Sequence, residues 1–527
     1  MIAAIFVIFL ALDLSDAASI AHVTRHHAAS SGPADLCDSQ VYCDGPLLHT
    51  VQLAGIFNDS KTFVDLYQLH DPNVTVENFN ALMNATNNSP NRTEIAAFVA
   101  ENFAMQDELE NTTLPDWKEK PPILKSINDP QYQEWAKRLN YIWKTLARKI
   151  NDNLVINPQR HSLIYVNNTF VIPGGRFKGD CQRVAKYYDY THDEKFLKKN
   201  IALLEKEFEY WQNKKTVNVK KNGRTYRMAH YVVNSRGPRP ESYKEDYQLA
   251  QQVPEQKRGA LYNNLKAAAE SGWDFSYRWS IGTNKGAKLS LVNASTSDII
   301  PVDLNAMLQR NAKMLAYFHF VLGNTKKLQH YNKIASDYQT AIDNVLWNEN
   351  EGTWLDYDTR NKRSRNTFYP SNLTPLYTMS YNLEKRIKYA LRTISYLKKN
   401  KIDSYFGGTP TSMNYTGEQW DFPNAWPPLQ SFLILGLQQT KVKEAVDLAE
   451  TLADRWLRSN YLGYDEYGKM FEKYNAIHPG EGGGGGEYNV QEGFGWTNGI
   501  VFELLRLFPN AKSTDDIGYD DGNSIDR

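Results

Sequence analysis

Residues 135–150 read WAKRLNYIWKTLARKI, and large apolar side chains recur in this stretch at intervals of three or four residues. In a helix, such intervals bring side chains onto one face. The face consists of Trp135, Leu139, Ile142, Leu146 and Ile150. We therefore predict an amphipathic helix that buries this stripe as far as residue 150.

The same spacing recurs in two later stretches of the chain. The stripes are Leu197, Ile201, Leu204, Phe208 and Trp211, and then Leu304, Leu308, Leu315, Phe318 and Leu322. Asp303 precedes the last stripe and is a candidate N-cap. Strand-like alternation is sparse, no fixed-period repeat is present, and no Pro/Ser-rich linker divides the chain after residue 120. The pattern predicts one large all-α domain of paired helices, a bundle or a toroid, with function in the loops at one end.

The composition favours a neutral partner. The chain has 527 residues, of which 41% are hydrophobic and 13% aromatic, so it can form a substantial core. Its 60 Lys and Arg balance its 60 Asp and Glu, which leaves no net field to attract nucleic acid or an anionic membrane. The 32 Tyr and 12 Trp can pack in a core or offer flat faces and polar edges to a sugar.

The first residues are typical of a secreted protein. Residues 2–12 are apolar but too few to span a bilayer, which suits the core of a signal peptide. We predict a signal peptide at 1–18, a folded domain at 19–512 and a polar, disordered tail at 513–527. No later segment is apolar for long enough to anchor the chain in a membrane.

Cysteines and glycosylation acceptors agree with secretion. Cys37 and Cys43 are close enough to close a small loop in an oxidising compartment, which leaves Cys181 over. The Asn-X-Ser/Thr acceptors begin at Asn58, Asn73, Asn84, Asn87, Asn91, Asn111, Asn167, Asn293, Asn372 and Asn414. Any one could arise by chance, but their density favours an extracellular location.

Two aromatic segments carry candidate chemistry. Residues 270–276 read ESGWDFS and place Asp274 between two aromatics, where partial desolvation would raise its pKa and suit it to act as a general acid. An N-capping or salt-bridged aspartate is the alternative. Residues 419–428 read QWDFPNAWPP, a proline-stiffened loop that suits a stacking subsite for a sugar, or else a helix entry capped by Asp421.

A third segment pairs two carboxylates with glycines. Glu472 and Glu487 flank the five residues Gly482 to Gly486, with aromatics nearby. Glycosidic cleavage needs two carboxyl groups across the scissile bond, and pyranose rings are gripped by aromatic faces. The alternative is a flexible linker between charged loop ends.

These segments together resemble the trehalases, inverting glycoside hydrolases that split trehalose into two glucose molecules. The resemblance covers most of the chain, from DSKTFVD at 59–65 through PGGRF at 173–177 and RGPRPESY at 236–243 to QEGFGWTNG at 491–499. It implies an (α/α)6 barrel, with Asp274 as general acid and Glu472 as general base. It also implies that five residues bind substrate: Arg176, Arg239, Glu241, Gly272 and Glu487.

The chain departs from the family after Phe177. The family continues there with sugar-contacting segments, including a Trp-Asp pair and an Arg-Ser-Gln-Pro-Pro stretch. This chain passes instead through Lys178 to Val184 directly into the YYDYTHD of 187–193, which in the family lies well downstream. We infer that a block of about one helical hairpin is missing, through exon skipping or a faulty gene model.

The deletion keeps two functions open. The chain is a secreted trehalase that uses Asp274 and Glu472, or a catalytically inactive trehalase-like isoform with residual carbohydrate binding. A third reading, a related barrel glycosidase acting on another glucoside, fits the trehalase signatures less well. No metal or other cofactor is expected, because Cys and His show no ligand spacing.

Overall fold

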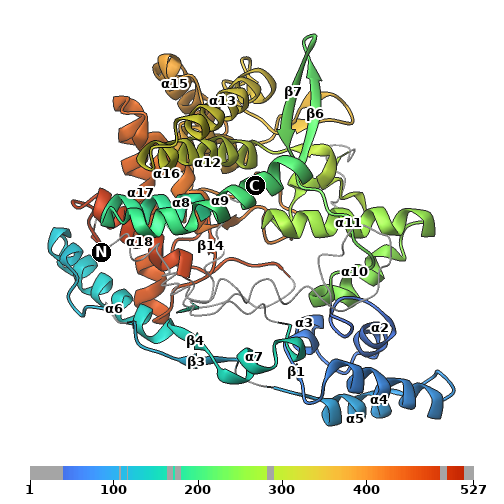
Figure 1. Ribbon diagram of the computed structural model, residues 1–527. Coiled ribbons are helices and arrows are strands. Elements are labelled where there is room, and N and C mark those ends of the chain that lie inside the picture. Colours follow the sequence, from blue (N-terminus) through green and yellow to red (C-terminus); the bar gives the residue numbers. More distant parts are fainter. Residues whose placement is uncertain are drawn as a thin grey trace.

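A computed structural model describes residues 39–105, 108–114, 117–162, 170–171, 180–281, 290–486 and 495–514. Helices dominate these residues, and the strands are short and lie in small separate sheets (Figure 1). The predicted helical class is confirmed. No helix in the described part of the chain is long and apolar enough to cross a membrane.

The α-helices follow one another along the whole chain. Their bounds are α2 (Pro46–Leu53), α3 (Ser60–Val64), α4 (Pro72–Ala85), α5 (Arg92–Asn102), α6 (Pro130–Leu146), α7 (Asp152–Ile156), α8 (Asp180–Thr191), α9 (Glu194–Lys214), α10 (Tyr243–Ala250), α11 (Glu255–Ser271), α12 (Val302–Val321), α13 (Thr325–Ala341), α14 (Thr374–Thr378), α15 (Arg386–Lys399), α16 (Pro427–Gln439), α17 (Lys443–Tyr467) and α18 (Gly495–Leu507).

The strands pair mostly as antiparallel ribbons. Their bounds are β1 (Tyr67–Gln68), β2 (Phe103–Ala104), β3 (Leu109–Asn111), β4 (Arg148–Ile150), β5 (Phe170–Val171), β6 (Thr216–Lys221), β7 (Arg224–Ala229), β8 (Ile299–Ile300), β9 (Trp347–Asn348), β10 (Thr353–Trp354), β11 (Tyr357–Asp358), β12 (Arg363–Ser364), β13 (Asn424–Ala425) and β14 (Tyr474–Asn475). The longest pair, β6 with β7, projects from the helical body (Figure 1).

The core forms where apolar helix faces meet. Helix α12 packs along α13 and also contacts α9 and α14, so it is covered on several sides. Most of its predicted stripe is buried, and Leu322 caps its end. The stripe of α9 is likewise confirmed, with Leu197, Leu204 and Phe208 fully or almost fully buried. Helical periodicity therefore located the core correctly in both helices.

Two details of the helical reading are wrong. Helix α6 ends at Leu146, and Ile150 instead lies in β4, which pairs with β3 and β5. Asp303 is not the N-cap of α12, because Pro301 holds that position and Asp303 lies in the first helical turn. Both differences come from partners distant in sequence, which a local pattern does not reveal.

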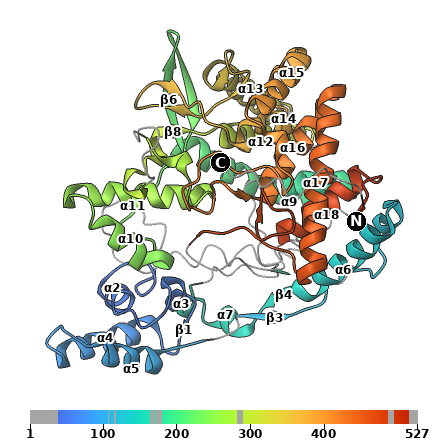
Figure 2. The same ribbon diagram turned by 180° about the vertical axis from the view of Figure 1, so that it is seen from behind.

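Helices α2 to α5 form a unit with its own apolar core. In both views this unit lies at one lower corner, away from α13 and α15 (Figures 1 and 2). Its core joins residues from Val41 to Phe103 and includes Tyr243, at the start of α10. The α10 contact thus ties the N-terminal unit to the segment that also carries Arg239 and Glu241.

The structure also bears on the edges of the folded region. Cys43 is disulfide-bonded, whereas Cys37, its predicted partner, lies outside the described residues, as does the signal peptide at 1–18. Ser513, the first residue of the predicted tail, is fully buried, and its hydroxyl donates to Asp129 Oδ2 at 3.1 Å. The folded region therefore includes Ser513; residues 515–527 lie outside the described part.

Candidate active site

The loop that carries Asp274 begins where α11 ends. Gly272 closes this helix with a left-handed backbone (φ 79°), a conformation that favours glycine. The chain then turns under Trp273, whose backbone N–H donates to Ser271 Oγ at 3.0 Å. Trp273 and Phe275 are buried on either side of the half-buried Asp274. Since no helix begins at Asp274, the N-cap alternative does not apply.

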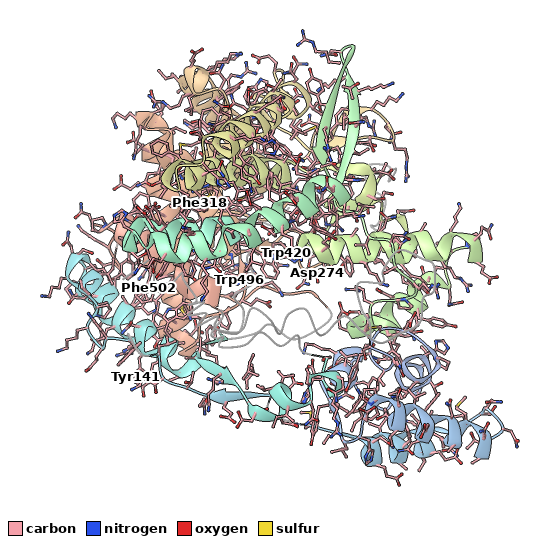
Figure 3. The ribbon with its side chains drawn as sticks, viewed as in Figure 1. Tyr141, Asp274, Phe318, Trp420, Trp496 and Phe502 are labelled. Atoms are coloured by element: carbon pink, nitrogen blue, oxygen red, sulfur yellow. The ribbon has the colours of Figure 1, made fainter. Side chains whose placement is uncertain are left out.

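The 419–428 segment packs directly on this loop. The Gln419 side-chain amide donates to the backbone oxygen of Asp274, and the Trp420 N–H donates to Phe275 O at 3.1 Å. The Trp420 ring stacks on Trp273 with centroids 5.2 Å apart and on Trp426 at 3.9 Å. The predicted stiff aromatic loop therefore forms one wall beside Asp274, and Figure 3 shows Asp274, Trp420 and Trp496 near the middle of the molecule.

Asp421 links the loop that carries Asp274 to the 419–428 segment. Its buried carboxylate accepts hydrogen bonds from Ser276 Oγ at 2.9 Å, Tyr277 N at 2.7 Å, Ser412 Oγ at 2.8 Å and Thr416 Oγ1 at 2.7 Å. Burial nevertheless raises the pKa of Asp421 to about 6, because desolvation disfavours the charged form. Asp421 caps no helix; it is a tertiary clamp between the Asp274 loop and the 419–428 segment.

A buried ion network supports the same loop from the other side. The guanidinium of Arg278 is fully buried and donates to Asp356 Oδ2 and to Asp303 Oδ2, each at 2.8 Å. Its Cζ atom also lies 4.5 Å from the centre of the Trp273 ring. The side chain of Asp303 thus serves this network rather than a helix cap, and Arg278 stabilises the turn that follows Asp274.

The segment that carries Glu472 is held by backbone pairing. Glu472 comes just before β14, which pairs with β13 in the 419–428 segment. The backbone oxygen of Glu472 accepts from Trp496 Nε1 at 3.1 Å, so α18 also fixes its position. Glu472 is only 2% exposed. Strand pairing thus brings this glutamate, 198 positions after Asp274 in the sequence, to the wall that supports the Asp274 loop.

Lys473 lies beside Glu472 and is linked to the Asp274 loop through Gln419. It is fully buried, with Nζ 3.8 Å from Glu472 Oε2, 3.4 Å from Gln419 Oε1 and 5.0 Å from the centre of the Trp426 ring. Burial lowers the pKa of Lys473, and the charges of Glu472 and then Asp274 oppose that change. Glu472 therefore contacts this ammonium group directly, and the charge of Asp274 also acts on it.

The glycine run is packed rather than free. Gly483 N donates to Lys473 O at 2.9 Å, and Gly484 N donates to Asn424 Oδ1 at 2.9 Å. A Cβ atom on Gly483 would lie 2.5 Å from Asn424 Oδ1, so a larger residue does not fit there. At Gly483 the run comes close to Asn424 and Lys473, which a flexible linker would not do.

Of the remaining predicted substrate-binding residues, two are described by the structure and two are not. Arg239 is buried and pairs with Asp246 through two side-chain hydrogen bonds. Its Cζ atom lies 4.6 Å from the centre of the Phe275 ring. Glu241 is exposed in the 3-10 turn just before α10. Arg176 and Glu487 lie outside the described residues. The structure thus brings Arg239 next to the Asp274 loop.

Sequence reasoning missed Lys473, the clamp role of Asp421 and the Arg278 network. Lys473 follows Glu472 directly, but a lysine is usually exposed, so nothing in the sequence marked it as buried. The described residues contain no group of three or more His, Cys, Asp or Glu side chains placed to hold a metal ion.

Two carboxyl residues in the loops of a helical scaffold, beside a buried cation and stacked indoles, provide the groups that a glycoside hydrolase needs. A sequence model of the trehalase family matches residues 55–179 and 181–509. The chain belongs to the trehalase family. Its mostly helical architecture agrees with the (α/α)6 fold predicted from the family resemblance.

Individual relatives support this placement over nearly the whole chain. A trehalase of Pimpla hypochondriaca is 47% identical over an alignment of 568 positions, which covers 97% of this chain and 96% of the relative. A trehalase of Apis mellifera is 41% identical and covers 91% of this chain and 86% of the relative. Among solved structures, the neutral trehalase Nth1 of Saccharomyces cerevisiae is 18% identical with a TM-score of 0.46, over 63% of this chain and 62% of that one.

Proposed function

We propose that this chain hydrolyses α,α-trehalose to two glucose molecules by an inverting mechanism, with Asp274 as general acid and Glu472 as general base. The observation that carries the proposal is the position of Lys473, in a chain of the trehalase family: its Nζ atom lies 3.8 Å from Glu472 Oε2 and is linked through Gln419 to the backbone of Asp274. Asp274 and Glu472 are 198 positions apart in the sequence, so this common link depends on the fold.

The two carboxyl groups suit different tasks. Asp274 lies between buried aromatics, a setting that favours the protonated form needed to protonate the leaving oxygen. Glu472 has a cation within 4 Å, which favours the ionised form needed to activate water. An inverting enzyme separates such groups by about 6.5–9.5 Å so that a water molecule fits between the base and the anomeric carbon.

Substrate contacts are proposed at five positions. Arg176, Arg239, Glu241, Gly272 and Glu487 match the sugar-binding positions of the family. A neutral disaccharide presents hydroxyl groups, and charged Arg and Glu side chains make the stronger, directional hydrogen bonds that select one stereoisomer. The Trp420 and Trp426 rings are almost fully buried and stack on each other, so they support this wall from within rather than present a face to the sugar. The chemistry needs no cofactor.

The missing block remains part of the proposal. The alignment with the Pimpla hypochondriaca trehalase runs over 568 positions, more than the 527 residues of this chain, so the relative carries positions without a counterpart here. The match to the family model is also interrupted at residue 180, at the junction inferred from the sequence. The first observation fits a block that is missing somewhere in this chain, and the second fits a junction after Phe177; that the block contacts sugar is part of the proposal.

We also propose that the protein is secreted. The described acceptor asparagines Asn58, Asn73, Asn84, Asn87, Asn91, Asn111 and Asn293 are exposed. Asn414 is half-buried, and Asn372 is fully buried and donates to Thr367 O at 3.0 Å, so Asn372 is not a usable acceptor in the folded protein. The disulfide at Cys43 supports the same compartment.

Glucose release from trehalose tests the proposed function. Asp274→Asn and Glu472→Gln should each lower kcat by roughly 10²–10⁴-fold or more. Asp447→Asn and Glu110→Gln, which alter exposed carboxylates in surface ion pairs, are the matched controls and should retain activity. Normal turnover in either active-site variant would remove that residue from the mechanism. A wild-type chain that binds trehalose without releasing glucose would support the inactive isoform instead.

A further inference from the structure

Lys473 places an ordinarily charged amino group where a neutral polar residue would be far less costly. It is 0% exposed and lies beside a glutamate that is 2% exposed. Burying an ammonium group costs several kcal/mol unless close charges and hydrogen bonds compensate. The described charges that act favourably on it are Glu472 and then Asp274. Its compensation therefore comes from the two residues assigned to acid and base.

Lys473 contacts the two carboxyl residues in different ways. Its Nζ atom lies 3.8 Å from Glu472 Oε2, whereas it reaches the Asp274 segment through Gln419, whose amide oxygen accepts from Nζ at 3.4 Å and whose amide nitrogen donates to Asp274 O. The direct charge contact is with Glu472. A bridge of neutral groups leads to the backbone of Asp274.

We propose that Lys473 is a positioning residue for the acid–base pair: it keeps the buried Glu472 ionised as the base and, through Gln419, fixes the loop that presents the acid Asp274. This inference rests on the proposed function. Burial alone would raise the pKa of Glu472 towards the value of a protonated carboxyl group, which cannot activate water. The neighbouring ammonium group opposes that rise, and it acts less on Asp274, which must keep its proton.

The surroundings of Lys473 limit its freedom to do anything else. Gly483 N donates to its backbone oxygen, and its Cγ atom would lie 3.0 Å from a Cβ atom on Gly483. The Trp426 ring covers the ammonium group with its face, a further favourable contact for a cation. The side chain is thus held in one position by packing on the glycine run and the 419–428 segment.

The experiment compares two neutral replacements, Lys473→Met and Lys473→Gln, with the charge-retaining Lys473→Arg. Lys215→Met is the matched control. Lys215 is also buried, at 3% exposure, but its Nζ atom pairs with Glu270, at 2.6 Å from Oε1, rather than with Glu472. Circular dichroism identifies the variants that fold. Two readouts follow: the pH dependence of kcat/KM on trehalose, and infrared titration of the carboxylic acid C=O band of Glu472, assigned by its loss in Glu472→Gln.

In the neutral Lys473 variants, we expect the acidic limb of the pH profile and the infrared midpoint of Glu472 to move up together by about one unit or more. Lys473→Arg should restore the wild-type midpoint, and Lys215→Met should leave it unchanged. An unchanged Glu472 midpoint in the neutral variants would overturn the role of Lys473. The infrared titration needs no turnover, so it still tests the Lys473–Glu472 coupling if the chain releases too little glucose for a pH profile. The absence of glucose release even after the family block is inserted after Phe177 would count against the proposed function itself.

Discussion

The loop that carries Asp274 and the segment that carries Glu472 are held in place by different forces. Around Asp274 the support is ionic and polar: the Arg278 network on one side and the Asp421 clamp on the other. Around Glu472 it is backbone against backbone, through β13 with β14 and the close approach of Gly483. The stability of the loop that carries Asp274, the acid side, should therefore respond to charge and pH. The stability of the segment that carries Glu472, the base side, should respond to added volume.

The largest expected effect lies outside both regions. Because both supports are intact, we expect the block that we propose to be missing after Phe177 to be what limits turnover. Charge-assisted hydrogen bonds are each worth about 1.5–3 kcal/mol, so the loss of two or three would lower turnover by several powers of ten. Inserting the corresponding block of the family between Phe177 and Gln182 should restore trehalose hydrolysis. Near-normal hydrolysis by the 527-residue chain as it stands would contradict this expectation.

Breaking the ionic support of the acid side should cost the most stability. Arg278→Met leaves the carboxylates of Asp303 and Asp356 without their buried cation, so the free energy of unfolding should fall by about 3–5 kcal/mol. Arg360→Met, which removes an arginine 54% exposed and paired with Asp298, should cost about 1 kcal/mol or less. Urea unfolding measures both. Equal losses would show that burial does not distinguish the two pairs.

The Asp421 clamp predicts a pH dependence of stability. Its pKa is raised in the folded protein to about 6 from an ordinary 3.8, so the folded state holds the proton more tightly. The resulting stabilisation is present below about pH 4 and is lost as pH rises through about 6, a change of about 3 kcal/mol. Asp421→Asn cannot titrate. The stability difference between wild type and this variant should shrink by that amount between pH 4 and pH 7; a constant difference would rule out the raised pKa.

A single methyl group sharpens the contrast on the base side. Gly483→Ala would press on Asn424 Oδ1 and Lys473, and we expect a loss of about 1–3 kcal/mol in the free energy of unfolding together with lower turnover. Gly484→Ala meets nothing within 4 Å and is the matched control next door. Thermal unfolding and glucose release are measured on both. If the two variants behave alike, the run is looser than its contacts indicate.

Helical periodicity predicted much of the fold but not where tertiary partners intervene. The stripes of α9 and α12 were correct because helix faces bury residues at regular intervals. Ile150 continued such a stripe, yet pairing with β3 and β5 placed it in a strand. Asp303 looked like a cap because capping is local, whereas its real partner, Arg278, is 25 residues away.

The candidate site was only partly visible in the sequence. Asp274 and the 419–428 segment stood out because aspartate, tryptophan and proline together are unusual, and the structure packs them against each other. The glycine run resembled a hinge, because sequence cannot distinguish free glycines from glycines required by a close approach. Lys473 carried no signal at all, since its burial depends on Glu472, Gln419 and Trp426 meeting in the fold.

The stereochemistry of the products tests the central claim most directly. If Asp274 protonates the leaving oxygen while Glu472 activates water on the opposite face, one glucose is released with inverted configuration and the other keeps its own. Proton NMR during the first turnovers, before the anomers equilibrate, should then show β- and α-glucose in equal amounts. The appearance of α-glucose alone would contradict the inverting acid–base assignment.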